Sequence, residues 1–565
     1  MKSINKSLKY IVFTAAALSL NACTKLDETT YDTLNSDKFY NNKNEIISAV
    51  LRPYTHANAW ATPSGQDGWW RPSEISADQL AWPTKGRHGE DGGKWKRLHY
   101  HTWTNDEPGL NQAWVLMYWG IGLCNIPIQN IEKRDAAAIG LTQEEKDQYV
   151  AELKLLRAYH YLKLMDLFGN IPIVTESPSE PIPTDQYPAN STRKEVFDFI
   201  EKEIKDNIDK APKLTSGKTQ GQLGRMSEAG GYAMLVELYL NAEVWTGTPR
   251  WDECIAAADK LISNGAGGQN GPMALDSNIT DQFKPLNNLS KEVIFSIAYE
   301  FQKANFQPSW TGEFFHFNQS LIYGGSRNGN DGVVVVPGVY TTFNDKDKRK
   351  KEWLLEGPQL RFDNNEPVIA TGGNEYDGKP LVFVDNIRRN KQAADNGTDP
   401  AQLSSTMSDG EENSGVRFNK YKLGNQVLGF GGIAPNPNYN STDWNLYRLT
   451  WIYFAKAEAI MRKNGNSANA EAVKLINDCK KRAYTTADWA DAAYTPSTLT
   501  MDELLAERGR EFIFEGFRRD DMIRFGKFTT ATWWDHQPST KTRELFAIPQ
   551  QQVSLNTKLK QNPGY

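Results

Sequence analysis

The sequence predicts a mostly α-helical protein in which irregular helical repeats pack against a loop-rich region with short β-strands. Several long segments carry apolar residues at helical spacing. The most regular of them is followed by Gly169 and Pro172, which end a helix sharply. From about residue 265 to 440, helical spacing gives way to Gly- and Asn-rich sequence with a few short β-type runs. These three observations define the fold class.

The segment 147–174 is the predicted centre of the helical part. One face of this helix collects the apolar side chains Leu155, Ala158, Tyr159, Leu162 and Met165. Arg157, His160 and Lys163 are expected at the flanks of that face. Other segments carry similar stripes, and each needs a neighbour to cover it. This pattern favours stacked helix pairs.

The remaining elements follow from the same spacing and from cap residues. Further helices are expected at 36–58, 111–133, 192–210, 225–245, 251–263, 443–463, 469–482 and 500–514. The helix 111–133 should run antiparallel to the central one, and 192–210 should pair with 225–245. Thr500 begins the last helix with a capping box. Short strands are expected at 292–299, 333–336 and 381–384. The segment 60–108 has no helical period and is expected to be a long ordered loop.

Residues 1–22 have the pattern of a lipoprotein signal peptide. Three lysines precede an apolar run at 10–20, which is too short to span a membrane as a permanent helix. The run leads into Leu-Asn-Ala-Cys, so Cys23 is expected to be the acylated first residue of the mature protein. Residues 23–35 would then form a lipidated tether. An ordinary cleaved signal with a chance cysteine is the alternative.

Charge and cysteine content exclude several classes of partner. The net charge is −5 and no basic block stands out, which argues against nucleic acid. Cys124, Cys254 and Cys479 lie among apolar neighbours in predicted helices, so we expect small buried hydrophobic side chains. No Cys/His spacing suggests zinc, and the Asp-rich stretch at 344–347 departs from a calcium loop. We therefore expect neither a metal nor a cofactor.

Three stretches resemble the signatures of the SusD/RagB family of cell-surface glycan-binding lipoproteins. They are LRAYHYLKLMDLFGNIPIV at 156–174, LLAERGREFIFEGFRRDDMIRFGK at 504–527 and LFAIPQQQVSLNTKLKQNPGY at 545–565. The resemblance implies a single SusD-like domain over 36–565. In that domain, tetratricopeptide-like repeats would occupy 36–58, 111–264 and 443–527, and a variable glycan-binding region would occupy 60–108 and 265–440.

Tryptophans in the first long loop are the main candidates for ligand binding. Six of them fall in this loop: Trp60, Trp69, Trp70, Trp82, Trp95 and Trp103. A flat indole stacks well on the apolar C–H face of a sugar ring. We expect four of the six to be structural. Trp82 and Trp95 flank a Gly-rich tip and are expected to be exposed, with Trp70 as a weaker candidate.

A second aromatic patch lies at 310–327. It contains Trp310 and Tyr323 among Gly and Asn residues, and ends at Arg327. The family resemblance implies that the same two regions form the sugar platform. We therefore expect Trp82 and Trp310 to share the platform, with Trp95 and Tyr323 nearby and Arg327 bonding sugar hydroxyls.

The acid–base run between Glu507 and Arg524 has two interpretations. Glu507, Glu511 and Glu515 are spaced four residues apart, so they share a helical face. They could serve as catalytic carboxylates. We expect instead a partly buried ion network that holds the last helices to the stack, because Arg is suited to forked pairing with carboxylates.

The resemblance implies a non-catalytic protein on the outer face of the outer membrane, held there by lipid. It would capture a polysaccharide or oligosaccharide and pass it to a SusC-like TonB-dependent transporter. One alternative is an all-α toroid glycosidase or polysaccharide lyase, which needs two carboxylates across a cleft. Another is a helical-repeat adaptor that binds only proteins. The sequence leaves the identity of the glycan open.

Overall fold

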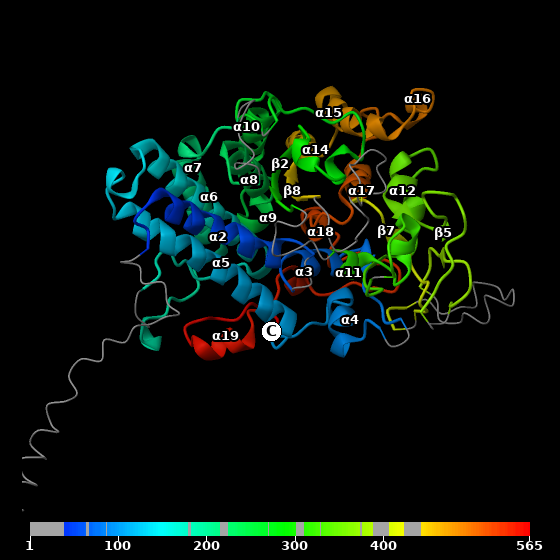
Figure 1. Cartoon of the computed structure of the whole chain (residues 1–565), viewed down its shortest axis with the longest axis horizontal. Helices are drawn as coiled ribbons and strands as arrows, with labels where there is room; N and C mark the ends of the chain where they lie inside the picture. The colour runs from blue at the N-terminus through cyan, green and yellow to red at the C-terminus, as the bar shows by residue number, and fades with distance from the viewer. Residues whose placement is uncertain are drawn as a thin grey trace, which may run out of the picture.

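In a computed structural model of the chain, the helices pack in sequence as a series of neighbouring pairs. The model describes residues 39–63, 67–85, 88–178, 182–214, 224–268, 270–300, 310–327, 329–372, 376–387, 406–408, 410–422 and 442–565. Figure 1 shows the helical part on the left and at the top, and the loop-rich part with α12, β5 and β7 on the right. The predicted fold class is therefore confirmed.

The helical part is built from long helices with clear start and stop residues. They are α2 (Lys43–Ala61), α5 (Pro108–Glu132), α6 (Gln143–Phe168), α7 (Arg193–Asn207), α8 (Glu228–Leu240), α9 (Ala242–Thr246), α10 (Trp251–Ile262), α14 (Leu449–Lys463) and α15 (Ala470–Lys480). Near the C-terminus, α17 (Met501–Phe512), α18 (Arg518–Arg524) and α19 (Gln550–Leu555) follow. Thr142 and Glu145 form a capping box at the start of α6, and Gly169 ends it at φ 68°.

The central helix α6 is buried on all sides over most of its length, not on one face alone. It packs against α5 and α7, and also contacts α2 and α8. Arg157, His160 and Lys163, which were expected at the flanks of the apolar face, are all buried. Each of them makes at least one polar contact inside the core: Lys163 Nζ, for example, donates to Glu237 at 2.6 Å.

Pairing between the helices differs in one respect from the prediction. The helix α7 packs mainly on α6, whereas α8 packs mainly on α10. The predicted start at residue 36 lies outside the described residues, but α2 itself begins only at Lys43, where Asn42 accepts a hydrogen bond from the Glu45 N–H. Cys124, Cys254 and Cys479 are buried and unpaired, as expected.

The loop-rich part holds short helices and two-stranded sheets. The short helices are α3 (Trp70–Ile75), α4 (Lys94–His99), α11 (Trp310–Phe314) and α12 (Lys348–Glu352), whereas α16 (Trp489–Ala492) follows α15 in the helical part. The strands are β1 (Leu80–Ala81), β2 (Val293–Ile297), β3 (Val334–Val335), β4 (Leu354–Leu355), β5 (Gly357–Pro358), β6 (Val382–Phe383), β7 (Arg417–Phe418) and β8 (Trp444–Arg448). The pairs in the described ranges are β1–β3, β2–β8, β4–β7 and β5–β6. The first long loop is thus interrupted by α3 and α4, which the sequence pattern did not predict.

The strand β8 replaces the predicted first turn of a helix. Residues 444–448 pair antiparallel with β2, and Ile297 lies opposite Trp444. The helix α14 begins only at Leu449. The partner strand lies about 150 residues earlier in the chain, so tertiary pairing overrides local helix propensity here.

A buried ion network ties the loop-rich part to the last helices. The Arg349 guanidinium of α12 pairs with Asp347 at 2.7 Å, Glu507 at 2.7 Å and Glu511 at 2.9 Å. Lys420 Nζ pairs with Glu515 at 2.6 Å. These side chains are almost fully buried, so the structural interpretation of the acidic run is confirmed. Within the described ranges, every helix is too short or too polar to span a membrane.

Candidate functional site

Trp82 and Trp95 lie face to face in the first loop region, as part of the core. Their ring centroids are 4.4 Å apart and their planes differ by 5°. Trp82 is 7% exposed and Trp95 is 2% exposed, so the expected exposure of both rings is wrong. Gly332 packs so closely on Trp82 that an added Cβ would lie 2.8 Å from the indole. The two rings cannot stack on a sugar in this arrangement.

Trp70 and Tyr323 are also core residues. The Trp70 indole N–H donates to the Phe514 carbonyl at 2.8 Å, and its ring meets Trp444 edge to face. The Tyr323 hydroxyl donates to Asn419 Oδ1 at 2.8 Å. All six tryptophans of the first loop are buried, whereas two of them were predicted to be exposed.

The other two predicted residues have different outcomes. Arg327 is exposed, and its guanidinium lies 5.0 Å above the ring of Phe317. Trp310 is the first residue of α11, but its side chain lies outside the described part of the structure. A role for Trp310 and Arg327 in binding therefore stays a prediction.

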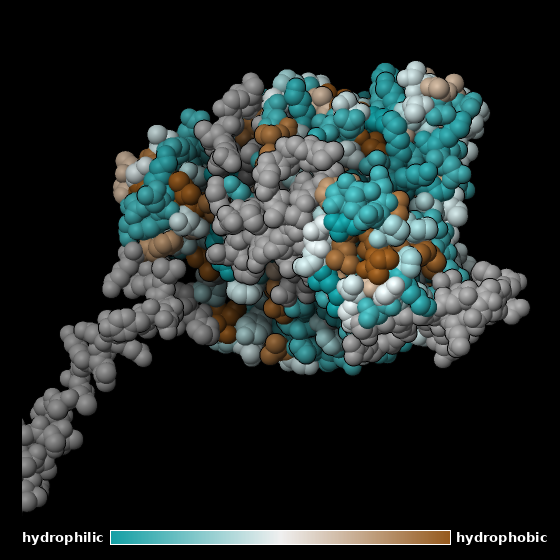
Figure 2. All heavy atoms as spheres, turned by 45° about the vertical axis from the view of Figure 1, so that its right-hand side comes forward, coloured by the Kyte–Doolittle hydropathy of each residue, from teal (hydrophilic) through white to brown (hydrophobic). Residues whose placement is uncertain are grey.

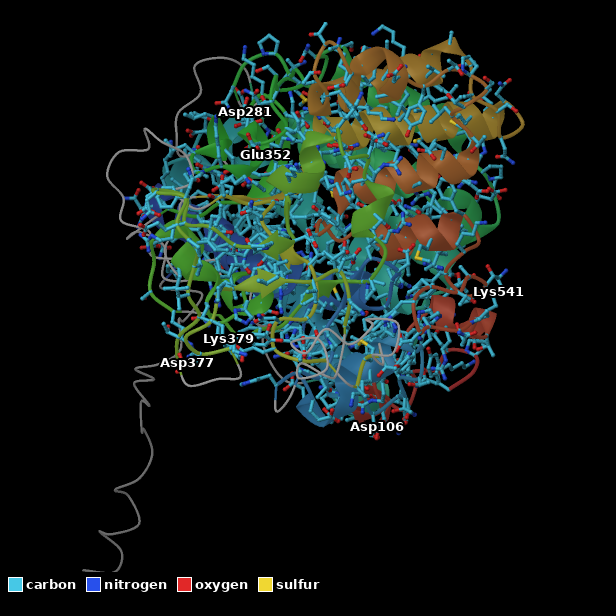
Figure 3. All side chains as sticks on the ribbon, turned by 90° about the vertical axis from the view of Figure 1, so that its right-hand side faces the viewer. Asp106, Asp281, Glu352, Asp377, Lys379 and Lys541 are labelled. Carbon is cyan, nitrogen blue, oxygen red and sulfur yellow. The ribbon has the colours of Figure 1, made fainter. Side chains whose placement is uncertain are left out.

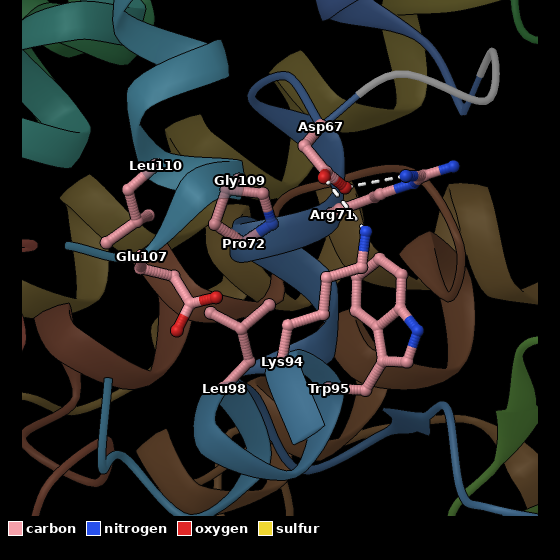
Figure 4. A pocket seen from close by; sticks show the side chains of 9 residues that line it. All are labelled: Asp67, Arg71, Pro72, Lys94, Trp95, Leu98, Glu107, Gly109 and Leu110. Atoms are coloured by element: carbon pink, nitrogen blue, oxygen red, sulfur yellow. Dashed lines mark hydrogen bonds and ion pairs between the residues drawn. The ribbon is translucent and has the colours of Figure 1, made fainter. Parts of the chain in front are cut away.

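A small pocket opens beside the Trp82–Trp95 pair (Figure 4). Its wall includes Asp67, Arg71, Lys94, Trp95 and Glu107. Its cavity volume is about 20 Å³. That is room for about one water molecule or one sugar hydroxyl, and too little for a sugar ring.

Charge pairing sets the chemistry of this pocket. Asp67 accepts from Arg71 at 2.6 Å and from Lys94 at 3.0 Å. Burial by itself raises the pKa of Asp67, but the two cations outweigh it and hold that pKa below its ordinary value. Lys94 Nζ also lies 4.2 Å from the centre of the Trp95 ring, so the ammonium covers the indole.

The two carboxylates of the pocket do not form a catalytic pair. Figure 4 shows Asp67 and Glu107 on different sides of the pocket. Asp67 is paired with Arg71 and Lys94, and Glu107 accepts from Arg97 at 2.6 and 2.9 Å. Glycoside hydrolysis needs a general acid that holds its proton at neutral pH. With its lowered pKa, Asp67 is ionised there and cannot donate a proton.

Two exposed aromatic side chains were missed by the sequence reasoning. Trp119 on α5 is 54% exposed, and Phe362 in the loop-rich part is 37% exposed. The sequence carried a signal for Trp119, because no residue from Pro108 to Ile131 is charged. Phe362 is a single aromatic residue in a polar run, and nothing in its local sequence marks it.

Comparison with known families assigns the protein to a class of glycan-binding proteins. Two family models match most of the chain: "SusD family" over residues 291–565 and "Starch-binding associating with outer membrane" over residues 26–240. The starch-binding protein SusD of Bacteroides thetaiotaomicron is 24% identical over 536 residues, which cover 89% of this chain and 86% of the relative.

Solved structures show the same fold. A SusD homolog from Bacteroides thetaiotaomicron superposes with a TM-score of 0.69 at 20% identity, covering 94% of this chain and 98% of the other. Surface glycan-binding protein A from the same species, in complex with laminarihexaose, has a TM-score of 0.66 at 18% identity, with 92% and 99% coverage. The chain belongs to the SusD/RagB family, a family of non-catalytic glycan-binding proteins associated with the outer membrane.

Proposed function

We propose that this chain captures a polysaccharide or oligosaccharide at the cell surface and delivers it to a SusC-like TonB-dependent transporter. One relative is named for starch, and one solved neighbour holds laminarihexaose. These names support a glycan ligand of this chain and leave its sugar open. For an open binding surface we expect a moderate affinity, with a Kd of about 1 μM to 1 mM.

The proposed contact with the transporter rests on an uncharged face of helix α5. On α5, the exposed residues Val115, Trp119 and Ile126 follow one another at helical spacing, with Gly122 between them. We call these four residues the α5 face. An exposed apolar surface of this kind is typical of a protein interaction site. It suits a large apolar partner surface, such as that of a membrane transporter.

The neighbouring helix α2 extends this surface. Leu51 is exposed on α2, and the ring of His56 lies 4.8 Å from that of Trp119. The Trp119 side chain is therefore held in place by its contact with His56. Large aromatic residues held in this way often dominate the binding energy of an interface.

Attachment to the membrane is the sequence-based part of the proposal. Cys23 lies outside the described residues, so its acylation rests on the signal peptide pattern. One acyl chain holds a protein only weakly, and stable attachment takes at least two. A lipid on Cys23 would keep the chain beside a transporter in the same membrane.

One cell-fractionation experiment tests the transporter and the anchor together. Tagged wild type, Cys23→Ala, Trp119→Ala and Leu289→Ala are expressed in the native cell and purified from solubilised outer membrane. Mass spectrometry then measures the co-purifying β-barrel protein. Leu289 is the matched control, because it is an exposed apolar residue outside the α5 face.

We expect Cys23→Ala to leave the membrane fraction. Trp119→Ala should stay in the membrane but lose most of the barrel, because truncating a hot-spot residue costs about 2 kcal/mol or more. Leu289→Ala should behave as wild type. Equal amounts of barrel with Trp119→Ala and wild type would contradict the role of the α5 face, and a membrane-bound Cys23→Ala would contradict the anchor.

A further inference from the structure

The strands β2 and β8 meet around one buried carboxyl group. Asp443 comes directly before β8, and its Oδ1 accepts the N–H of Tyr299, two residues after β2, at 2.9 Å. The hydroxyl of Ser296 in β2 lies 3.5 Å from the Oδ2 of Asp443. We call these three residues the strand junction. Its members lie up to 147 residues apart in the sequence, so the junction closes the chain segment that contains most of the loop-rich part.

A turn and a helix hold the strand junction in place. The side chain of Asn287 accepts the Asp443 N–H at 2.8 Å and donates to the Asp443 carbonyl at 2.8 Å. On the other side, the Tyr299 hydroxyl donates to Asn58 Oδ1 of α2. The carboxyl group is therefore part of a fixed polar contact between β2, β8 and the helical part.

The carboxyl group of Asp443 is buried without a counter-charge. Hydrophilic atoms cover much of the upper right of the surface in Figure 2, whereas Asp443 is only 3% exposed. Lysines of neighbouring segments pair with other carboxylates: Lys284 with Asp281 at 2.7 Å, and Lys422 with Glu352 at 3.5 Å. Figure 3 shows Asp281 and Glu352 toward the upper part of the molecule. A buried carboxylate without a cation is costly, and the neutral acid is favoured in its place.

Two tyrosines are the titratable groups that face Asp443. Tyr299 follows β2 and Tyr421 follows β7, and the charge of Asp443 acts on both. Burial raises the pKa of each tyrosine, so both stay neutral below pH 8. Arg448, which also acts on Tyr421, is paired with Glu515 at 2.8 Å. Asp443 is therefore the member of this set whose charge changes between pH 5 and 8.

Burial raises the pKa of Asp443 to about 7, although the Tyr299 N–H and the Ser296 hydroxyl oppose the shift. When the strands separate, water reaches the carboxyl group and its pKa returns to about 3.9. Between these two pKa values the closed junction holds a proton that the open junction releases. The stabilisation from this proton is fully present below the pKa of the open junction. It is lost as the pH rises through the pKa of the closed junction.

We propose that Asp443 is a pH-sensitive switch: its proton keeps β2 paired with β8 at acidic pH, and release of that proton to water loosens the pairing. The inference goes beyond glycan capture, because it concerns how firmly the loop-rich part is held to the helical part. The chain between the two strands includes α11 and α12, so these elements depend on the same closure.

Hydrogen–deuterium exchange at pH 5, 6, 7 and 8 tests this proposal. After correction for the intrinsic exchange rate, the protection of an amide measures how rarely its hydrogen bond opens. The wild type is compared with Asp443→Asn, because an amide keeps the acceptor for the Tyr299 N–H, offers an N–H toward Ser296 as the acid does, and does not titrate. Asp252→Asn is the matched control, since the Asp252 side chain is 73% exposed.

We expect the protection of β2 and β8 in the wild type, divided by that in Asp443→Asn, to fall about 50-fold from pH 5 to 7. From pH 7 to 8 the ratio should change less than about twofold, because Asp443 is then largely ionised. Other titrating groups act in both proteins, so the ratio isolates Asp443. The ratio for the amides of α7 should stay constant, and Asp252→Asn should follow the wild type.

Two results would overturn the inference. A ratio that stays constant at β2 and β8 from pH 5 to 7 would show that Asp443 is not protonated in the closed junction. An equal fall of the ratio in α7 would show that Asp443 stabilises the whole fold and does not act as a switch at the junction. Should Asp443→Asn fail to fold, the wild type decides alone: protection of β2 and β8 that does not decrease from pH 5 to 7 would exclude the switch.

Discussion

Glu74 is a single carboxyl group enclosed in the protein core. It is fully buried, and its Oε1 accepts the Gly516 N–H at 2.5 Å. Burial raises the pKa of Glu74 to about 8, although the Gly516 amide and the charges of Arg518 and Lys420 oppose the shift. In the unfolded chain the same group has a pKa of about 4.3.

This difference in pKa makes the stability of the protein depend on pH. Between about pH 4.5 and 8 the folded state holds a proton on Glu74 that the unfolded state releases. The free energy of stabilisation that this proton provides is fully present below the pKa of Glu74 in the unfolded chain. It is lost as the pH rises through the pKa of Glu74 in the folded protein. The loss reaches at most about 1.4 kcal/mol per pH unit.

Glu74→Gln should remove this dependence, because an amide keeps the acceptor for Gly516 and does not titrate. Urea denaturation of both proteins at pH 5, 6.5 and 8 gives the free energy of unfolding at each pH. We expect the difference between the two proteins to change steadily in favour of the variant as the pH rises. Parallel pH profiles would show that Glu74 is not protonated in the folded state.

At this scale, sequence reasoning could find aromatic enrichment but not exposure. The ring of Trp82 is covered by Gly332, and that of Trp70 by Trp444, which lie hundreds of residues away. Burial of these rings depends on tertiary contacts that no local pattern contains. The exposure of the Phe362 ring could not be predicted either, because its neighbours in the sequence are ordinary turn residues.

At the scale of elements, α5 and α6 approach each other closely. A Cβ added at Gly120 of α5 would lie 2.1 Å from Nε2 of His160 on α6. His160 is fully buried, and its Nδ1 is held by the Leu156 carbonyl at 2.8 Å. The imidazole is therefore enclosed, and α5 and α6 would have to move apart to admit a methyl group.

Gly120→Ala should destabilise the protein by about 1–3 kcal/mol, as overpacking of a close helix contact does. Gly122→Ala on the same helix is the control, because nothing lies within 4 Å of its added Cβ. Alanine should stabilise the helix there by about 0.5–1 kcal/mol. Thermal melts of both variants measure the two effects. If Gly120→Ala melted at or above wild type, the close packing of α5 on α6 would be disproved.

Helices were the most predictable elements because their signals are local. Apolar spacing and cap residues such as Thr142 and Gly169 lie within the helix they define. The sequence patterns failed where distant pairing decides the structure, as in β8, which pairs with β2. They also failed for α3 and α4, which are too short to show a period. The predicted positions of β2, β3 and β6 were right, but their partners could not be inferred.

At the scale of the whole molecule, the ion network around Arg349 joins the two parts of the protein. Arg349 is fully buried and faces three carboxylates: Asp347, Glu507 and Glu511. Burial favours the neutral form of Arg349, but the three carboxylates outweigh it and raise its pKa well above the ordinary value. The guanidinium is therefore charged at every accessible pH.

Arg349→Ala should cost roughly 3–5 kcal/mol, because it leaves buried carboxylates without a partner. Lys194→Ala is the control: its ion pair with Asp198 is exposed at 65% and 53% of the two side chains, and such pairs contribute about 1 kcal/mol or less. Urea denaturation measures both. A loss of stability no greater for Arg349→Ala than for Lys194→Ala would mean that the network does not hold the two parts together.

The pairing of Ile297 with Trp444 has a consequence for replacing the segment between these two residues. The chain leaves the helical scaffold at the end of β2 and returns to it directly alongside, at the start of β8. Residues 298–443 therefore form a cassette whose two ends already meet. Any exchange of the cassette must preserve its buried ion pairs with the rest of the chain, such as that of Arg71 with Glu313. Arg349 and Lys420 belong to the cassette, whereas Glu507, Glu511 and Glu515 belong to the scaffold. A chimera with a replaced cassette therefore needs buried cations in the places of Arg349 and Lys420. Without them, Glu507, Glu511 and Glu515 would lose these counter-charges.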